Sequence, residues 1–286
     1  MSIKFKELNF TYSLKSPFEF RALKDINLEI EVNKITAIIG HTGSGKSTLV
    51  QHLNALLIPT SGELEVCDFI VTNDKKKNKH LKNIRKRVGL VFQFPEYQLF
   101  EETIAKDIGF GPKNFGVPQE EIDEIVKKVI KQVGLDESYL EKSPLELSGG
   151  QKRRVAIAGV LSSDPDIIIL DEPTSGLDPK GTKDIMGIFK ELNEKYNKTI
   201  ILICHDMNVV YEYAHNVIAM KDGMVAYSGS TVDLFSNEQL LNHLSLAAPR
   251  VVSFANELNK KGFSTNPKLI RNMDDLVDSI VKEMKL

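Results

Sequence analysis

Short runs of apolar residues recur along the chain, and longer stretches with helical character lie between them. The apolar runs are ITAII at 35–39, VGLVF at 88–92, IIIL at 167–170 and TIILIC at 199–204. Runs of this kind are typical of strands buried on both faces. Helices are predicted at 46–57, 119–133 and 179–195, the second from apolar residues that recur every three or four positions. This alternation predicts an α/β fold around a parallel sheet.

The first third of the chain and its C-terminal region depart from this pattern. Residues 3–12, 23–32 and 59–71 have the alternating character of strands, and the first two predict a small separate sheet. From about Ser236 the strands give way to two amphipathic helices, predicted at 251–261 and 273–284. We therefore predict one large domain over residues 1–240 and a helical extension over 241–286. The extension is either a small domain or a simple packing element.

Composition and charge narrow the choice of partners. Apolar residues make up 42% of the 286 residues, enough for a sizeable core, and the net charge is -2. This balance gives no case for nucleic acid, whose binding domains are usually basic. Residues 75–87 hold eight Lys and Arg. We expect a solvated loop and edge strand there, with contact to anionic lipid or nucleic acid as the alternative.

Cysteine use and hydropathy bear on the compartment. Cys67 and Cys204 are the only cysteines, and they lack metal-ligand or disulfide spacing, so a reducing cytosol is expected. The N-terminus has no apolar segment of signal-peptide length, and no apolar run approaches the roughly 20 residues of a membrane helix. A membrane would therefore be reached through a partner.

A glycine-rich segment follows the ITAII run and opens the first long helix. It reads Gly40-His41-Thr42-Gly43-Ser44-Gly45-Lys46-Ser47-Thr48 and matches the phosphate-binding pattern GxxxxGK[ST]. Glycines let backbone N–H groups wrap around phosphate oxygens, and the helix N-terminus adds partial positive charge. Lys46 is then expected to reach the β- and γ-phosphates, and Ser47 to bind Mg²⁺. A glycine-rich turn without a ligand is the alternative.

Acidic residues and a histidine follow two later strands. Asp171 and Glu172 follow IIIL directly. Asp171 is the candidate Mg²⁺ ligand, and Glu172 lies where it could polarise a water for attack on the γ-phosphate. Such a pair can instead cap a helix. His205 follows TIILIC. A lone histidine after a strand is often structural, but the edge where parallel strands end is where open α/β sheets bind ligands.

A second anion-binding element lies between the glycine-rich loop and the acid pair. Leu147-Ser148-Gly149-Gly150-Gln151 precedes the helix-forming run KRRVAIAGVL, and Ser-Gly-Gly at a helix start can hold phosphate. One chain thus carries two phosphate sites and one acid pair. The sequence LSGGQ lies between the glycine-rich loop at 40–48, called the P-loop below, and the acid pair. In this position it resembles the signature of the ATP-binding cassette ATPases. In that family two chains dimerise head to tail, and each signature closes over the nucleotide on the other chain's P-loop.

The resemblance spans residues 1 to about 236 and implies a fold, an activity and cofactors. The implied P-loop cassette fold has a parallel-sheet core, a small antiparallel β subdomain and a helical signature subdomain at about 95–163. The implied activity is hydrolysis of ATP to ADP and phosphate, with ATP and Mg²⁺ bound. Gln93 matches the glutamine that contacts Mg²⁺ or water, and His205 the switch histidine at the γ-phosphate. Tyr12 matches the ring that stacks on adenine, with Phe10 or Phe18 as alternatives.

Two further sets of residues are implied to act across the dimer. The signature residues that would contact the partner's nucleotide are Ser148, Gly149, Gly150 and Gln151. The D-loop residues that would cross the interface are Ser175, Gly176, Leu177 and Asp178.

Three kinds of cassette ATPase compete: a transporter engine, a soluble enzyme acting on DNA or ribosomes, and a stand-alone regulator. DNA-repair types divide the cassette with a long coiled coil, and no heptad run lies between Lys46 and Gly150. Ribosome-acting types carry two cassettes, whereas this chain carries one. These features favour a transporter engine over a non-transport enzyme.

The segment 92–112, FQFPEYQLFEETIAKDIGFGP, indicates the kind of transporter. It holds five of the chain's fourteen Phe and seven Tyr. The segment, SGGQKRRVAIAGVL and the C-terminal extension resemble the ATPases of energy-coupling factor transporters, which drive uptake of vitamins and transition-metal ions. FQFPE-x-QLF is most similar to the second of two paralogous ATPases. A homodimer serving a dedicated cobalt or nickel importer is the alternative.

The resemblance also implies partners and a location. A second cassette ATPase, a paralogue or the same chain, would pair with this one, partly through residues 241–286. A membrane scaffold protein would bind near Phe94–Phe100, and a substrate-capturing membrane protein would join indirectly; no nucleic acid is expected. The chain would lie at the cytoplasmic face of the cell membrane. Exposed rings rimmed by Glu96, Glu101 and Glu102 suggest a basic helix as the scaffold's docking element.

Overall fold

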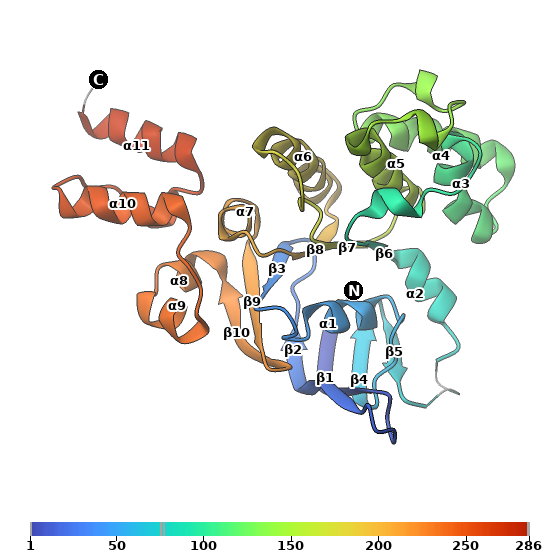
Figure 1. Ribbon diagram of the computed structural model, residues 1–286, viewed down its shortest axis with the longest axis horizontal. Helices are drawn as coiled ribbons and strands as arrows, with labels where there is room; N and C mark the ends of the chain where they lie inside the picture. Colours follow the sequence, from blue (N-terminus) through green and yellow to red (C-terminus); the bar gives the residue numbers. More distant parts are fainter. Residues whose placement is uncertain (1, 75, 77, 285–286) are drawn as a thin grey trace.

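A six-stranded sheet forms the centre of the computed structural model, which describes residues 2–74, 76 and 78–284 (Figure 1). The strand order is β10-β9-β3-β8-β7-β6, and neighbours from β9 to β6 are parallel. The strands are β3 (Ile35–Ile39), β6 (Val88–Val91), β7 (Ile167–Asp171), β8 (Thr199–Ile203), β9 (Asn216–Lys221) and the antiparallel edge strand β10 (Met224–Ser230). The predicted parallel α/β core is confirmed.

A second, antiparallel sheet lies below it in the order β2-β1-β4-β5. Its strands are β1 (Ile3–Tyr12), β2 (Phe20–Glu29), β4 (Ser61–Val66) and β5 (Phe69–Thr72). The stretch 59–71 is therefore two strands joined by a tight turn. Cys67 and Asp68 form that turn, both with positive φ. Both cysteines are buried.

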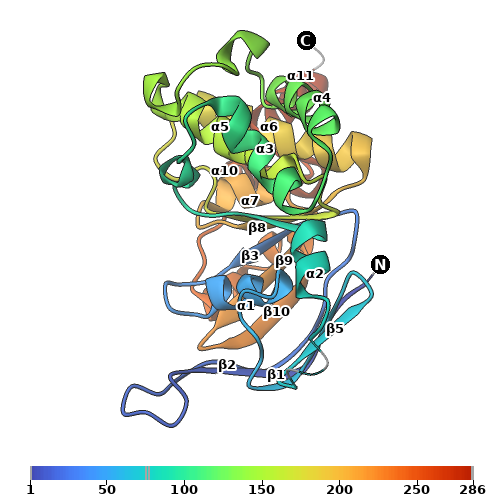
Figure 2. The same cartoon turned by 90° about the vertical axis from the view of Figure 1, so that its right-hand side faces the viewer.

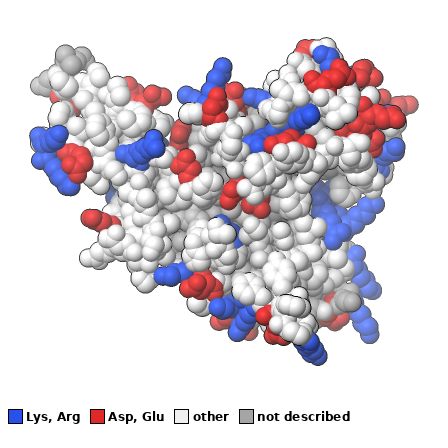
Figure 3. All heavy atoms as spheres, viewed as in Figure 1, with Lys and Arg blue, Asp and Glu red and all other residues white. Residues whose placement is uncertain are grey.

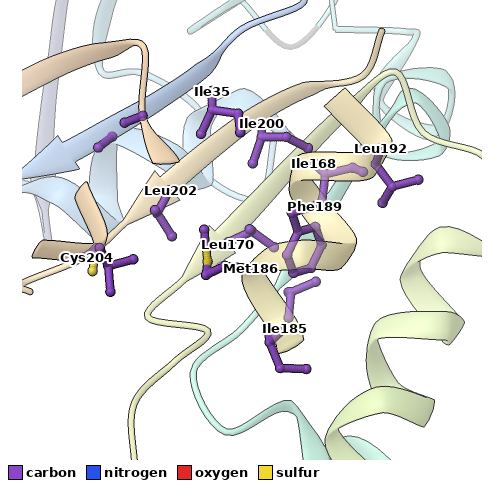
Figure 4. Packing of buried hydrophobic residues seen from close by; sticks show 14 of the residues in the cluster. Ile35, Ile168, Leu170, Ile185, Met186, Phe189, Leu192, Ile200, Leu202 and Cys204 are labelled. Atoms are coloured by element: carbon purple, nitrogen blue, oxygen red, sulfur yellow. The ribbon is translucent and has the colours of Figure 1, made fainter. Parts of the chain in front are cut away.

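Alternating residues of the central strands face two separate hydrophobic clusters. Ile167 and Ile169 pack with the antiparallel sheet and with α1 (Lys46–Leu53). Ile168 and Leu170 face the other way, toward the side chain of Phe189 on α6 (Pro179–Tyr196) (Figure 4). The uninterrupted apolar run is thus explained by burial on both faces. The phosphate-binding loop and the acid pair leave the sheet from between these clusters.

A helical lobe stands on the side of β6 and β7 (Figure 1). It contains α3 (Ile104–Asn114), α4 (Gln119–Gln132) and α5 (Gly149–Leu161), which contact one another, with three short 3₁₀ turns. The turns are η1 (Pro95–Gln98), η2 (Glu137–Tyr139) and η3 (Pro144–Glu146). α4 begins at the predicted residue and ends one residue before Val133.

The C-terminal region is a run of short helices at the opposite end of the molecule (Figure 1). It contains α8 (Thr231–Phe235), α9 (Glu238–Leu244), α10 (Arg250–Lys260), η4 (Pro267–Leu269) and α11 (Met273–Met284). Before it, α7 (Met207–Tyr213) joins β8 to β9. The division expected between residues 240 and 241 falls within α9. The amphipathic helices expected at 251–261 and 273–284 are present as α10 and α11.

The basic run differs from its prediction. Residues 81–87 form the helix α2 (Leu81–Arg87), and the edge strand of that region is β5 instead. Ile84 is fully buried, so one apolar anchor is enough to dock a helix whose other faces are charged. Arg87 pairs with Asp166 at 2.6 Å. Lys75 and Lys77 lie outside the described residues. No helix of the described chain is long and apolar enough to cross a membrane.

Candidate functional site

The glycine-rich loop runs from the end of β3 to the start of α1, as its pattern predicted. Gly40, Gly43 and Gly45 have φ values of 142°, 80° and 101°. A Cβ at Gly40 would lie 2.3 Å from the carbonyl oxygen of Met220, and one at Gly45 would lie 2.9 Å from that of Ala22. Both positions therefore exclude side chains. Gly43 has open space around it, so only its backbone conformation favours glycine there.

Lys46 folds back over this loop. Its Nζ donates to the carbonyl oxygens of Gly40 at 2.9 Å and His41 at 2.8 Å. Burial lowers the pKa of Lys46, while nearby Glu172 and Asp171 act in the opposite direction. The hydroxyl of Ser44 is fully buried and has no hydrogen-bond partner among the residues that the structure describes. A cation and an unpaired hydroxyl facing one loop fit the phosphates of a nucleotide.

Asp171 ends β7 and faces the start of α1. Burial raises its pKa, as does the neighbouring Glu172, and a hydrogen bond from Ser47 together with the charge of Lys46 opposes that rise. Ser47 and Asp171 thus present a hydroxyl and a carboxylate side by side. Such hard oxygen donors fit Mg²⁺, which takes a few protein oxygens and completes its shell with phosphates and water. Among the described residues, no cluster of three or more His, Cys, Asp or Glu forms an all-protein metal site.

Glu172, Gln93 and His205 meet at the carboxyl edge of the sheet. The Gln93 Nε2 donates to Glu172 Oε2 at 3.0 Å, and His205 Nδ1 lies 3.5 Å from the same oxygen. Glu172 has a φ of 50°, and its backbone N–H donates to the carbonyl oxygen of Ile203 at 3.0 Å, which fixes the turn. The structure therefore brings Gln93 and His205 to the carboxylate of Glu172. The three predicted residues follow three different strands of the sheet.

Tyr12 lies beside the P-loop helix. Its hydroxyl is 3.2 Å from the Thr48 hydroxyl, and its ring packs edge-on against Phe10 with centroids 4.7 Å apart. The Tyr12 side chain is 37% exposed, whereas Phe10 is buried and Phe18 is 83% exposed in the loop between β1 and β2. Phe10 therefore has no free face for a base, which leaves Tyr12 and Phe18 as candidates.

We expect Tyr12→Ala to weaken ATP binding by about tenfold, since stacking of a base on a ring contributes roughly 1–3 kcal/mol. Tyr12→Phe should stay within about twofold of the parent, because the ring remains and only the contact to Thr48 is lost. Calorimetric titration of ATP into the purified chain measures both. If Phe18→Ala weakens binding instead and Tyr12→Ala does not, Phe18 is the stacking ring.

The signature residues begin α5 and are exposed. Ser148 caps the helix, and it forms a reciprocal capping box with Gln151. A Cβ added at Gly149 or Gly150 would meet nothing within 4 Å, so the helix start is open to an incoming group. α5 and α1 lie in different lobes in both views (Figures 1 and 2). The structure therefore separates the two elements of one chain that are predicted to bind phosphate.

Arg153 connects three predicted segments, and the sequence analysis missed it. This residue of α5 is only 5% exposed and pairs bidentately with Glu96 at 2.8 and 3.1 Å. It also donates to the carbonyl oxygen of Pro173 at 3.3 Å, just before the D-loop, and to that of Ser175 at 2.9 Å within it. Asp178 ends that loop by capping α6 through Gly181 N–H. No local pattern identifies Arg153, because its partners lie 20 to 57 residues away.

The aromatic segment is exposed as expected, but its acidic rim is smaller than expected. Tyr97 and Phe100 are 85% and 65% exposed, and Phe94 and Phe110 are partly exposed. The expectation that Glu96 belongs to the rim is wrong: its side chain is 15% exposed and faces inward to Arg153. Glu101 and Glu102 remain, the latter in an ion pair with Lys106.

Comparison with known proteins gives consistent matches. Residues 23–175 match the family described as ABC transporter. The chain is 52% identical to an energy-coupling factor transporter ATP-binding protein EcfA2 of Enterococcus faecalis, covering 100% of this chain and 98% of that protein. It is 52% identical to the protein of the same name from Clostridium perfringens, covering 94% of each.

Solved structures agree with this. One is cbiO1 from Clostridium perfringens, described as part of the ABC transporter complex cbiONQ. It has a TM-score of 0.73 and 38% identity over 90% of this chain and 98% of that one. Another is a dimeric post-hydrolysis state of the ATP-binding cassette MJ0796 bound to ADP and Pi. It has a TM-score of 0.71 and 32% identity over 80% of this chain and 98% of that one.

Proposed function

The chain belongs to the ATP-binding proteins of energy-coupling factor transporters, within the ABC transporter family, and from this premise we propose how its residues power transport. It is an ATPase subunit of such a transporter. We propose which residues hydrolyse ATP, which partner chains they contact, and that they do so at the cytoplasmic face of the membrane. The cluster of Gln93, Glu172 and His205 around one carboxylate carries this proposal.

In the proposed reaction Glu172 orients a water and accepts its proton as the water oxygen bonds to the γ-phosphorus. The bond from that phosphorus to the bridging oxygen breaks, and ADP leaves. Gln93 and His205 both contact Glu172 Oε2, and His205 would also reach the γ-phosphate. Lys46 exchanges its two loop carbonyls for β- and γ-phosphate oxygens. Ser47, Asp171 and Gln93 would hold Mg²⁺, which when bound neutralises charge on the phosphate oxygens.

We further propose that each complete site needs two chains. The exposed start of α5, with Ser148, Gly149 and Gly150, would close over the nucleotide of a second cassette ATPase. Separation of α5 from the chain's own P-loop supports this (Figure 1). The second ATPase would be a paralogue, because the segment FQFPE-x-QLF resembles the second of two paralogous ATPases and the relatives at 52% identity are named EcfA2. A homodimer, as in a dedicated cobalt or nickel importer, is the second candidate, and the likeness to cbiO1 favours it at lower identity.

The exposed rings of residues 94–110 would face a membrane scaffold protein at the cytoplasmic face of the membrane. Their cluster includes Phe100 and Phe110, whose rings pack edge-on with centroids 5.0 Å apart. Acidic side chains gather over this helical lobe (Figure 3). A substrate-capturing membrane protein would join through the scaffold, and vitamins or similar micronutrients would be the cargo.

Co-purification tests the proposed partners. The tagged chain, extracted with its membrane in mild detergent, should recover a second cassette ATPase of different sequence and an integral membrane protein. Recovery of the membrane protein with this chain alone would favour the homodimer. Recovery of ribosomes or DNA without a membrane protein would contradict a transporter assembly.

Charge reversal tests the scaffold surface. We expect Glu101→Lys with Glu102→Lys to weaken scaffold binding about tenfold and to reduce its dependence on salt, because rim charges steer association. Scaffold recovery at two salt concentrations is the measurement. Glu120→Lys with Glu121→Lys, two exposed acids at the start of α4, is the matched control. Equal recovery of both double variants would count against an electrostatic docking surface.

A further inference from the structure

The C-terminal extension is attached to the helix that follows the switch histidine. His205 is followed by Asp206, which caps α7: both the backbone N–H and the Nδ2 of Asn208 donate to Asp206 Oδ1 at 2.8 Å. α7 has only seven residues. So short a helix is marginal by itself, and its orientation depends on the contacts made around it.

At the N-terminal end of α7, the C-terminal extension contacts Asn208. The backbone N–H of Arg250, the first residue of α10, donates to Asn208 Oδ1 at 2.9 Å. Asn208 therefore joins the N-cap of α7 to the start of α10. The contact lies two residues after Asp206 and three after His205.

At the C-terminal end of α7, the contact from the extension is made by Arg271. Its Nη2 donates to the carbonyl oxygen of Ala214, the C-cap residue of α7, at 2.5 Å. Its guanidinium carbon lies 5.0 Å from the centre of the Tyr211 ring, which is 1% exposed and packs edge-on against Phe235. A cation at the C-terminal end of a helix also meets the negative end of the helix dipole.

The same end of α7 is joined to the phosphate-binding strand. The next residue, His215, donates its backbone N–H to the carbonyl oxygen of Ile35 at 2.8 Å, and its Nδ1 accepts from the Ile35 N–H at 3.1 Å. Ile35 is the first residue of β3, which leads to the P-loop. Arg271 therefore holds α7 where that helix is tied to the site's central strand.

The surroundings make Arg271 a distinct point of attachment. A cleft of about 1000 Å³ separates α10 and residues 271–274 from α7 and the start of α6. Figure 3 shows the hollow between the C-terminal helices and the body of the molecule. Arg271 and Arg250 line it, and each makes one of the hydrogen bonds to α7 described above.

We propose that Arg271 is a positioning residue for ATP hydrolysis: by fixing the end of α7, the C-terminal extension keeps His205 beside Glu172. Removing Arg271 takes away the donor to the Ala214 carbonyl and the cation over Tyr211. α7 can then pivot at the bonds between His215 and Ile35, and its N-terminal end moves together with Asp206 and His205. His205 Nδ1, now 3.5 Å from Glu172, is thereby displaced from the position it needs beside Glu172. The inference rests on the proposed role of His205.

A cycle of variants in the assembled complex tests this, with steady-state ATPase kinetics as the readout. We expect Arg271→Met to lower kcat about 5- to 30-fold and to change KM for ATP less than about twofold, because misplacement of a catalytic group acts on the chemical step. Arg271→Lys, which keeps the charge over Tyr211, should lose only about two- to fivefold. Lys268→Met, at an exposed lysine of the same segment, is the matched control and should leave kcat unchanged.

Coupling to His205 separates positioning from simple docking. In a His205→Ala background, Arg271→Met should lower kcat by less than about twofold further, since residues acting through one group are not additive. Full additivity, or a wild-type kcat for Arg271→Met, would overturn the proposal. If Arg271→Met does not assemble, the same cycle with Arg271→Lys decides. His205→Ala without effect would instead show that the proposed role of His205 is wrong.

Discussion

Glu172→Gln is expected to lower the rate of ATP hydrolysis by about 10²- to 10⁴-fold, the range that a positioned general base contributes. The amide cannot accept a proton from water. It has nearly the shape of the carboxylate, so its oxygen can still accept from the Gln93 Nε2 that now donates to Glu172 Oε2 at 3.0 Å. The backbone bond from Glu172 N–H to Ile203 is also unaffected. ATP should therefore bind and hold two chains together without turnover.

Two measurements together check this. Phosphate release from the assembled complex gives the rate, and size-exclusion chromatography with ATP shows the trapped ATPase pair. Glu194→Gln, an exposed acid on α6, serves as the control for loss of one carboxylate and should behave as the parent. A near wild-type rate for Glu172→Gln would remove Glu172 from the chemistry.

Arg153→Met is expected to lower the free energy of unfolding by about 3–5 kcal/mol, because it leaves a partly buried carboxylate without its counter-charge. Glu96 is 15% exposed, and the variant also removes the donor to Pro173 and Ser175. ATPase activity should fall as well, because the D-loop carbonyls are no longer held. Denaturant titration of the purified chain measures the stability. Lys152→Met, at the preceding position on the same helix, controls for loss of a positive charge.

The ion pair also predicts a dependence on pH. Burial alone would raise the pKa of Glu96, but the hydrogen bond and charge of Arg153 outweigh it and hold the pKa below its ordinary 4.5. A carboxylate with a depressed folded pKa stabilises the fold above its unfolded pKa, and this contribution is lost as pH falls through the folded value. The stability difference between the parent and Glu96→Gln should thus be constant above about pH 5 and shrink below pH 4.5. A difference that does not shrink would argue against the pair.

Periodicity predicted the core strands well because their environment is uniform. β3 begins and ends at the predicted residues, and β6, β7 and β8 each differ by one residue at one end. The sequence analysis did not predict β9 and β10. β10 is an edge strand and only half buried, so it has no continuous apolar run to mark it. β9 is an inner strand with a buried apolar run at 217–220, a signal that the sequence analysis overlooked. α2 was missed for a reason similar to that for β10, since Ile84 is its only buried residue.

The site was predictable wherever its residues follow strands in order. Lys46, Asp171, Glu172 and His205 lie as the motif order implied, and Gln93 joins them from the end of β6. The error at Glu96 has a different origin. Glu96 lies among aromatic residues in the sequence, which led to the expectation that its side chain is exposed. Its environment is set instead by Arg153, which is 57 residues away. Arg271 was equally invisible, since its partner Ala214 lies 57 residues earlier on another element.

The placement of the signature on a separate lobe from the P-loop has a consequence for the cell. A newly made subunit can hold ATP in its own loop, yet the groups that would complete the site belong to another molecule. Subunits that are present in excess of their partners should therefore hydrolyse almost no ATP, and hydrolysis should begin only when the complex assembles. An active site divided between two polypeptides, as proposed, would therefore guard against futile consumption of ATP.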